Sequence, residues 1–434
     1  MLRVVTHEDP RYEELLVALG SRGTSDLERV EPTVRAVLRE VQLEGDAAVI
    51  RHIERFESRK PPSPLFSTHF NGEEALAELN GSVREALCLS AHRIRAFHEQ
   101  QAGLMQTIEA SSEGVKLVTR TQPLERVGVY APGGKALYPS SVLMSAIPAK
   151  VAGVPVIIVA SPNPGPELRA ACHLAGVSGL LDCGGAQAIA ALAFGTNSIP
   201  RVDKIVGPGN IYVAAAKRLV FGRVSIDSIA GPSEILVLAD ESANPEWVAA
   251  DLLSQAEHDE AAYALLACTS AALASEVGRA LQAQLQSLPR KQIAEASLLS
   301  NGVAWVVPRT SGLVTIANRL AIEHLAIHTR DAELLAAGVR HAGAIFMGSM
   351  TPEAAGDYLA GPSHVLPTGG AARFSSPLGV YDFVSRTSLI GYSAQELRRQ
   401  APQITTLARA EGLEAHARAV EIRVSTSGCS PAES

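Results

Sequence analysis

The fold of this 434-residue chain is decided by a stretch in which short apolar runs alternate with glycine-rich turns. It reads RVGVYAPGGK at residues 126–135, VPVIIVA at 154–160, LLDCGGAQAIA at 180–190 and KIVGPGNIYV at 204–213. A continuous apolar run such as that at 154–160 is typical of a strand buried on both faces. Helical stretches follow the turns. This alternation predicts a parallel, doubly wound α/β sheet from about residue 126 to 230.

Composition argues against two classes of function. The chain is 47% hydrophobic and has a net charge of −7 without a basic stripe, so nucleic acid is not an expected partner. The longest apolar runs are too short to cross a bilayer, so no membrane role is expected. The five cysteines form no C-x-x-C pair, and the acidic N-terminus does not resemble a targeting peptide. We therefore expect a protein of the reducing cytoplasm.

Gln255 and His258 are three residues apart in a predicted acidic helix, so both side chains can face one metal ion. Glutamine is an unusual ligand for zinc, which prefers histidine, cysteine and carboxylate. On spacing alone, a solvated histidine on an exposed helix is the better interpretation. Asp357 heads a loop rich in glycine and proline, a kind of loop that often carries function, although it could also cap a plain surface turn.

Glu323 and His324 are two titratable residues inside an apolar stretch. Burial raises the pKa of a glutamic acid and lowers that of a histidine, which moves both toward the working pH of a general base. The alternative, a helix start with solvated side chains, is about equally compatible with the sequence.

The dinucleotide fingerprint G-x-G-x-x-G is absent. Gly207-Pro208-Gly209-Asn210 has glycines suited to close backbone approach, and the pairs 133–134 and 184–185 lie where strands end. In an open α/β sheet the ligand crevice lies outside the carboxyl ends of the strands. Cys183 lies in one such loop and could be a thiol nucleophile, but a small buried side chain is the favoured interpretation.

Several of these segments, taken in order, make the chain resemble the histidinol dehydrogenase family over nearly its whole length. They are VGVYAPGGK at 127–135, GGAQAIA at 184–190, VGPGN at 206–210, AGPSE at 230–234, the segment with Gln255 and His258, Glu323-His324, the loop at 356–383 and EGLEAH at 411–416. One departure is Ile322, where proline is expected. It precedes the catalytic pair but replaces no reacting group.

The resemblance implies a zinc-dependent, four-electron oxidation of L-histidinol through L-histidinal to L-histidine with two NAD, the last steps of histidine biosynthesis. Glu323 and His324 would be the catalytic bases. The implied NAD contacts are Tyr130, Gln187 and Asn210. One Zn²⁺ per subunit would be held by Gln255, His258, Asp357 and His416. The implied substrate contacts are Ser233, Gln255, His258, His324, Asp357, Glu411 and His416.

The resemblance also implies a homodimer with shared active sites, because His416 would come from the partner subunit. Its fold would have two incomplete Rossmann-like, doubly wound domains related to aldehyde dehydrogenases, with small helical arms. The expected division is an N-terminal arm at 1–25, a first α/β domain with the zinc and the catalytic residues at 26–125 and 234–380, an NAD-binding domain at 126–233, and a C-terminal arm at 381–434.

Three other functions compete with this one. A paralogue could oxidise another small polar alcohol, a zinc protein could have no catalytic role, or a plain alcohol dehydrogenase could stop at the aldehyde. Glu411 and His416 favour histidinol over another substrate. The buried position expected for Glu323-His324 favours an enzyme.

Overall fold

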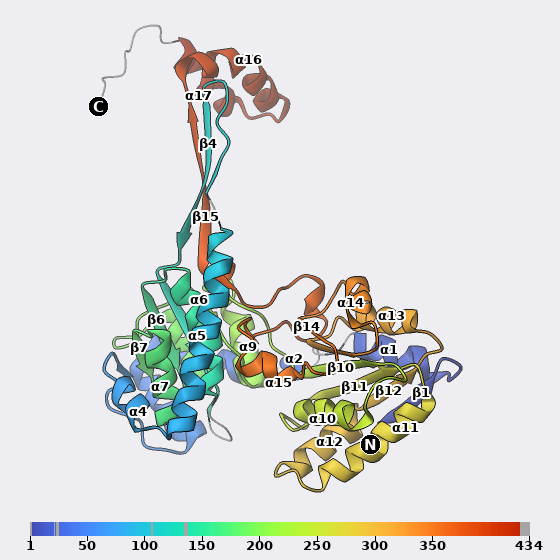
Figure 1. Cartoon of the computed structure of the whole chain (residues 1–434). Helices are drawn as coiled ribbons and strands as arrows, with labels where there is room; N and C mark the ends of the chain where they lie inside the picture. The colour runs from blue at the N-terminus through green and yellow to red at the C-terminus, as the bar shows by residue number, and fades with distance from the viewer. Residues whose placement is uncertain (1, 21, 23–25, 106, 134–137, 426–434) are drawn as a thin grey trace. The chain divides into compact units, whose positions relative to one another are not determined.

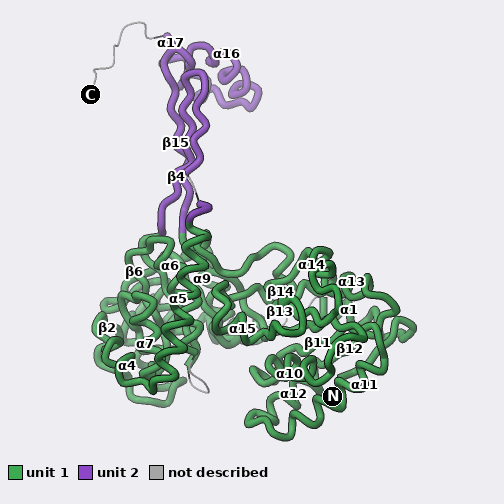
Figure 2. The backbone as a smooth tube through the Cα atoms, viewed as in Figure 1, with its two compact units in different colours: residues 1–102, 124–383 green, residues 103–123, 384–434 purple. Residues whose placement is uncertain are grey.

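The computed structural model describes residues 2–20, 22, 26–105, 107–133 and 138–425. The chain divides into a main unit, residues 1–102 and 124–383, and a C-terminal unit, residues 103–123 and 384–434 (Figure 2). The main unit contains two six-stranded sheets, and the C-terminal unit contains a three-stranded sheet and a helix pair. The predicted α/β class with parallel sheets is confirmed.

The first sheet is entirely parallel (Figure 1). Its order is β1 (Arg3–Thr6), β12 (Val303–Val306), β11 (Tyr263–Cys268), β10 (Glu234–Ala239), β13 (His324–His328) and β14 (Ala344–Met347). Successive side chains of a strand point to opposite faces, and β10 shows this directly. Its odd-numbered positions pack on one face and its even-numbered ones, Leu236 and Leu238, pack on the other.

Helices cover both faces of the first sheet. One face holds α10 (Pro245–Ala256), α11 (Ala271–Leu285) and α12 (Lys291–Asn301). The opposite face holds α1 (Arg11–Gly20), α13 (Thr310–Leu320) and α14 (Ala332–Gly338). Each fully buried Leu, Ile or Val side chain contributes roughly 1.5–3 kcal/mol, so these two layers fix the strands that carry the candidate site.

Five of the six strands of the second sheet lie within the predicted stretch, residues 126–230, and β2 (Phe66–Ser67) lies outside it. The strand order is β2, β7 (Gly179–Leu181), β6 (Val156–Ala160), β5 (Arg126–Tyr130), β8 (Lys204–Val206) and β9 (Ser225–Ile226), with only β2 antiparallel. One face packs on α2 (Asp26–Glu44), α3 (Asp46–His52), α8 (Gly185–Phe194) and α9 (Ile211–Val220). The other packs on α5 (Gly81–Gly103), α6 (Pro139–Val151) and α7 (Pro166–Ala175).

The packing differs from the expected domain division. Residues 27–53 and the α5 residues Ala91 and Ile94 lie in the cores of the second sheet, not with 234–380. Valines spaced three or four residues apart along α2 bury their stripe against α8 and α9. A helix's own sequence shows that it has an apolar face but not which sheet that face covers. The expected helical arm at 1–25 also contains β1, an edge strand of the first sheet.

The C-terminal unit is built around a long antiparallel pair. β15 (Val384–Tyr392) pairs with β4 (Val115–Pro123) along nine residues, and β3 (Ile108–Glu109) extends the sheet. The helices α16 (Ala394–Ala410) and α17 (Glu414–Ser425) pack on each other. Residues 103–123 therefore join the C-terminal residues, whereas 381–383 belong to the main unit. None of the described helices is long and apolar enough to cross a membrane.

Candidate active site

The predicted pair Glu323–His324 lies at the amino edge of the first sheet. β13 begins at His324 and its parallel neighbour β10 begins at Glu234, with His324 in register with Ile235. Glu323 and His324 are 7% and 5% exposed, so the expected burial is present and the helix-start alternative is not. The pair faces the amino ends of the strands, although ligands of open α/β sheets usually lie at the carboxyl ends.

The His324 imidazole has one engaged nitrogen and one free nitrogen. Its Nδ1 lies 3.0 Å from the backbone oxygen of Glu234, an acceptor, so the proton belongs on Nδ1. Among the residues that the structure describes, no group hydrogen-bonds the buried Nε2. That nitrogen lies 3.7 Å from Glu353 Oε1 and 3.9 Å from Asp357 Oδ1. Because Nδ1 is engaged, Nε2 is the nitrogen that can accept or release a proton, and it faces two carboxylates, which suits an acid–base role.

The expected direction of the His324 pKa is wrong. Burial alone would lower this pKa, and burial is the largest single influence. The carboxylates of Glu353, Glu323 and Asp357 together outweigh it and hold the pKa of His324 well above the usual value. The sequence showed the apolar neighbours of His324 but not the acidic residues that surround its ring.

The expected direction for Glu323 is confirmed. Burial raises the pKa of its carboxyl group above the usual value, as expected for a group meant to exchange protons near neutral pH. Its Oε2 accepts a hydrogen bond of 2.9 Å from the backbone N–H of Glu234 and lies 3.5 Å from His324 Nδ1. The carboxyl group therefore has a fixed orientation beside the imidazole.

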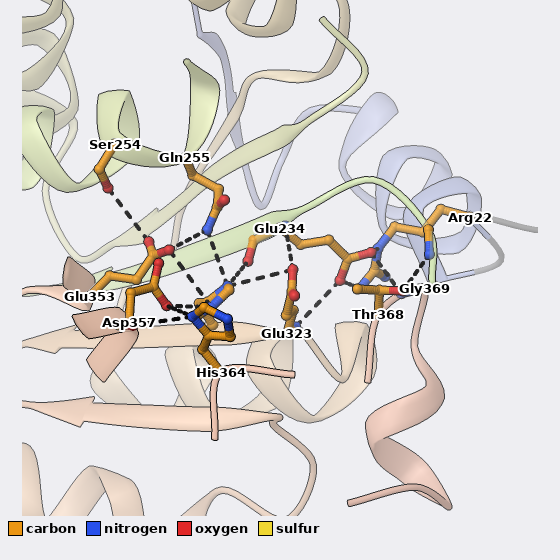
Figure 3. A network of polar contacts seen from close by, with 12 residues as sticks. Arg22, Glu234, Ser254, Gln255, Glu323, Glu353, Asp357, His364, Thr368 and Gly369 are labelled. Carbon is orange, nitrogen blue, oxygen red and sulfur yellow. Dashed lines mark hydrogen bonds and ion pairs between the residues drawn. The ribbon is translucent and has the colours of Figure 1, made fainter. Parts of the chain in front are cut away.

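Two carboxylates of the short helix α15 (Glu353–Tyr358) face the His324 imidazole. Figure 3 labels both of them, Glu353 and Asp357. Glu353 and Asp357 are four residues apart and so share one side of the helix. Burial raises the pKa of Glu353 to about 7. His324, Glu353 and Asp357 each offer one ligand atom within 4.8 Å of the others, which makes them a candidate metal-binding group. In the sequence only the four-residue spacing from Asp357 points to Glu353, which is not among the predicted site residues.

Gln255 and His258 approach this group from the end of α10. Gln255 is buried, and its Nε2 donates to Glu353 Oε1 at 2.6 Å and lies 3.1 Å from His324 Nδ1. His258 lies in the turn that follows the helix, and its backbone N–H donates a hydrogen bond of 3.1 Å to the backbone oxygen of Gln255. Burial lowers the pKa of His258, and Asp357 and His324 are the charges that influence it most. The predicted helix thus ends at Ala256, but its final turn still directs both residues to the group.

His364, in the loop at 356–383, is a further residue beside the group, and its segment alone suggested no role for it. Its Nδ1 donates to the backbone oxygen of Asp357 at 3.1 Å, and its Nε2 lies 3.4 Å from Ser141 Oγ on α6. Burial lowers its pKa. Ser233, the predicted substrate contact, directly precedes Glu234 and is partly buried, so it lies beside the pair.

Glu411 and His416 lie in the C-terminal unit, at the end of α16 and in α17, and both are exposed. His324 and its neighbours belong to the main unit, so these two residues and the His324 group lie in different units of the chain. Their predicted contribution from a partner subunit stays a prediction.

The three predicted NAD residues lie at the carboxyl ends of the second sheet, where β5, β7 and β8 lead into their turns and helices. Tyr130 is buried, its hydroxyl accepts from Gly185 N at 3.1 Å, and burial raises its pKa to about 12. Gln187 Nε2 donates to Glu57 Oε1 at 3.2 Å. Asn210 caps α9 by accepting from the N–H groups of residues 212 and 213. Part of one recognised segment, Gly134 and Lys135, lies outside the described residues.

Gly207, in the turn after β8, is a position where steric contacts require glycine. Gly207 has a φ of +106°, and a Cβ there would lie 2.1 Å from the backbone oxygen of Tyr130. The turn after β8 therefore requires glycine. Nearby, Cys183 is fully buried and its pKa is raised well above the usual value by burial, so it is a poor nucleophile at neutral pH.

Comparison with known proteins covers nearly the whole chain. Residues 20–424 match the family model described as histidinol dehydrogenase. Histidinol dehydrogenase of Syntrophotalea carbinolica is 50% identical over 432 residues, covering 98% of this chain and 100% of that protein. The enzyme of Aquifex aeolicus is 50% identical over 417 residues, covering 96% and 97%.

The fold agrees with these matches. The crystal structure of histidinol dehydrogenase from Elizabethkingia anophelis superposes with a TM-score of 0.89 at 33% identity and covers 98% of each chain. Full-length sequence similarity and full-length structural similarity point to the same family. The chain therefore belongs to the histidinol dehydrogenase family.

Proposed function

We propose that this chain oxidises L-histidinol through L-histidinal to L-histidine, reducing two NAD, in the last steps of histidine biosynthesis. The observation that carries the proposal is the buried pair Glu323–His324, whose His324 Nε2 has no hydrogen-bond partner among the described residues and faces the carboxylates of Glu353 and Asp357. A structural zinc protein has no use for such a buried base. The family relatives supply the substrate's identity through their names.

His324 is the base for the alcohol step. Hydride can leave the carbinol carbon only if the hydroxyl proton is removed, and Nε2 of His324 accepts this proton when the ring is in its deprotonated form. The Nδ1–H stays hydrogen-bonded to the backbone oxygen of Glu234, and this bond holds the ring in the required tautomer. The electron pair released goes with the hydride to the nicotinamide ring. A positioned base of this kind typically contributes about 10²–10⁴-fold to the rate.

Glu323 is the base for the aldehyde step. The aldehyde must first add water to become a gem-diol, and a carboxylate removes the proton from the attacking water. The elevated pKa of Glu323 makes it a stronger base than an exposed glutamate. As the water adds, His324 gives the proton it took in the first step to the aldehyde oxygen. It then accepts a proton from the diol as the second hydride leaves to the second NAD, and the product is the carboxylic acid.

The donors present fit one zinc ion per subunit. Gln255 touches Glu353 and His324, and Asp357 and His258 lie within electrostatic range of each other, so the group offers carboxylate, imidazole and amide donors. In the proposal Gln255, His258, Asp357 and His416 of the partner subunit hold the ion. Bound zinc would hold the imidazole and amino nitrogens of the substrate and so orient the carbinol carbon.

The proposal assigns NAD to the carboxyl ends of the second sheet, near Tyr130, Gln187 and Asn210. It also makes Ser233 and the partner subunit's Glu411 substrate contacts, in a homodimer with shared sites. The scattered cysteines and the biosynthetic role support a cytoplasmic location. The alternative is a paralogue that oxidises another small polar alcohol with the same base and metal.

The stoichiometry of NADH tests the proposed function. Because each oxidation transfers one hydride, L-histidinol should yield two NADH per molecule. Removing metal with a chelator should abolish the reaction, because the substrate loses its anchor, and added Zn²⁺ should restore it. Absorbance of NADH with a limiting amount of substrate measures the yield. One NADH per substrate would indicate a plain alcohol dehydrogenase, and faster turnover of another alcohol would favour the paralogue.

Replacing Glu323 with glutamine should separate the two oxidations. The amide can still accept the N–H of Glu234, so the fold is expected to persist. It cannot accept a proton, so oxidation of the aldehyde should fall by about 10²–10⁴-fold while alcohol oxidation changes far less. An aldehyde-trapping reagent should then collect L-histidinal at nearly one NADH per substrate. An E323Q enzyme that completes both steps at the native rate would contradict the role.

A further inference from the structure

Arg22 is a cation buried inside the main unit, close to the catalytic pair. Its side chain is 2% exposed, and it forms a two-pronged ion pair with Glu234, with Nε–Oε1 and Nη2–Oε2 distances of 2.6 Å each. Its Nη1 also donates to the backbone oxygens of Leu19 and Leu320 at 2.5 and 3.0 Å. The guanidinium is thus held by the ends of α1 and α13 and directed at the start of β10.

Glu234, the partner of Arg22, also forms hydrogen bonds to both residues of the catalytic pair (Figure 3). Its carboxylate Oε2 accepts from the backbone N–H of Glu323 at 3.3 Å, and its own N–H donates to the Glu323 carboxylate at 2.9 Å. Its backbone oxygen accepts from His324 Nδ1 at 3.0 Å. Its Oε1 accepts from Gly369 N at 2.8 Å, which attaches the Gly- and Pro-rich loop as well. One residue therefore contacts both members of the pair.

The charges make Arg22 necessary for this arrangement. Glu234 is 1% exposed and lies against Glu323, whose carboxyl group is also buried, and two buried carboxylates repel each other. Without a cation, Glu234 would either take a proton or turn away from Glu323, because an unpaired buried charge is strongly disfavoured. A guanidinium fork holds both oxygens of a carboxylate and so sets its orientation as well as its charge.

We propose that Arg22 is a positioning residue for the aldehyde-oxidising step, acting through Glu234 on Glu323. The selectivity follows from the contacts. The Glu323 side chain accepts from the Glu234 N–H, and the Glu234 carboxylate in turn accepts from the Glu323 N–H. Among the described residues, Arg22 is the one whose side chain bonds to the Glu234 carboxylate. His324 instead bonds to a backbone oxygen, which the β10–β13 pairing holds in place. Loss of Arg22 should therefore disturb Glu323 more than His324. This inference rests on the proposed function.

The experiment measures the two half-reactions separately in the full-length enzyme, with L-histidinol and with L-histidinal supplied directly. Arg22→Met is expected to lower kcat for L-histidinal by about 10²-fold, since a misplacement of about 1 Å can cost that much. The KM values and the first oxidation should change by less than about tenfold in this variant. Arg22→Lys retains the charge but loses the fork, so its loss should be intermediate and confined to the second step.

Two further variants distinguish a role of Arg22 in positioning Glu323 from a purely structural role in holding the N-terminal segment on the sheet. Arg319 pairs with Glu13 at 2.8 Å and also connects α1 to α13, but it does not touch Glu234. Arg319→Gln should leave both half-reactions unchanged. Lys204→Met removes another buried cation, paired with Asp382 at 3.3 Å, and should lower the melting temperature without selective loss of the second step.

The outcomes are distinct. Wild-type enzyme that fails to oxidise L-histidinol would overturn the proposed function, whatever the variants do. With an active wild type, equal losses in both half-reactions of Arg22→Met, or no loss, would overturn the role of Arg22. If Arg22→Met does not fold, Arg22→Lys decides: a selective loss supports the proposal, and native rates in both steps overturn it.

Discussion

Replacement of His324 by asparagine is expected to lower kcat for L-histidinol by about 10²–10⁴-fold, the usual contribution of a positioned base. Asparagine can still donate to the Glu234 oxygen that now receives Nδ1–H, but it offers no basic nitrogen in the place of Nε2. The KM for L-histidinol should change much less, because the proposed metal ligands remain. Both oxidations should suffer, since His324 accepts a proton in each, which distinguishes this variant from E323Q.

His328 provides the matched control for this variant. It lies on the same strand, is similarly buried, and its Nε2 pairs with Asp251 Oδ2 at 2.8 Å, away from Glu323. His328→Asn should reduce the free energy of unfolding by about 1–3 kcal/mol, since it leaves a buried partner unsatisfied, while kcat stays near native. Thermal denaturation and NADH production measure the two effects. Native kcat in H324N, or an equal loss of kcat in both variants, would refute the assignment.

The sequence predicted a parallel sheet over about 126–230 because its strands are buried on both faces, whereas the division into two α/β domains was implied only by the family resemblance. Such strands give continuous apolar runs, and Val156–Ala160 of β6 is one of them. It did not predict β1, because only Val5 of the four residues Arg3–Thr6 is buried and the strand pairs with β12, about 300 residues away along the chain. Long-range pairing of this kind leaves little local pattern.

The residues of the site were predictable where they belong to recognisable segments. Glu323, His324, Gln255, His258 and Asp357 all lie in such segments, and the structure brings them together. Glu353 and Arg22 were not predicted. Arg22 lies in a short connection between helices, and its partner Glu234 is 212 residues away, so only the folded chain shows the ion pair.

The chain lacks the dinucleotide fingerprint, and the helix N-termini that follow β7 and β8 also differ from those of a typical Rossmann fold. Rossmann-type folds bind pyrophosphate with free N–H groups at a helix N-terminus. Here the first N–H groups at α8 already donate, Gly184 N to Glu57 Oε1 at 3.0 Å and Gly185 N to the Tyr130 hydroxyl at 3.1 Å. The side chain of Asn210 likewise occupies the N-terminus of α9. At both helix ends some of the first N–H groups are therefore already bonded within the protein.

The proposed sharing of the active site predicts a large loss from His416→Asn, although His416 lies in the C-terminal unit and is exposed in the single chain. If His416 of the partner subunit is a zinc ligand, the variant should lose zinc and nearly all turnover with native secondary structure. Bound zinc, measured after dialysis, and kcat report the two effects. His341 is a matched control, because it is a partly buried histidine outside the candidate site. His341→Asn should keep both zinc and activity.

Mixing two inactive variants tests whether the site is shared. His324→Asn and His416→Asn damage opposite sides of the proposed site, so a dimer with one subunit of each has one site with both defects and one site with none. Random exchange makes half of the dimers mixed, so about a quarter of all sites should regain native activity. If each site is instead formed by a single chain, every site in every mixture keeps one defect. Activity after unfolding and refolding the two variants together, compared with refolding each alone, therefore measures the sharing: recovery near a quarter requires two chains per site, and no recovery from folded dimers excludes it.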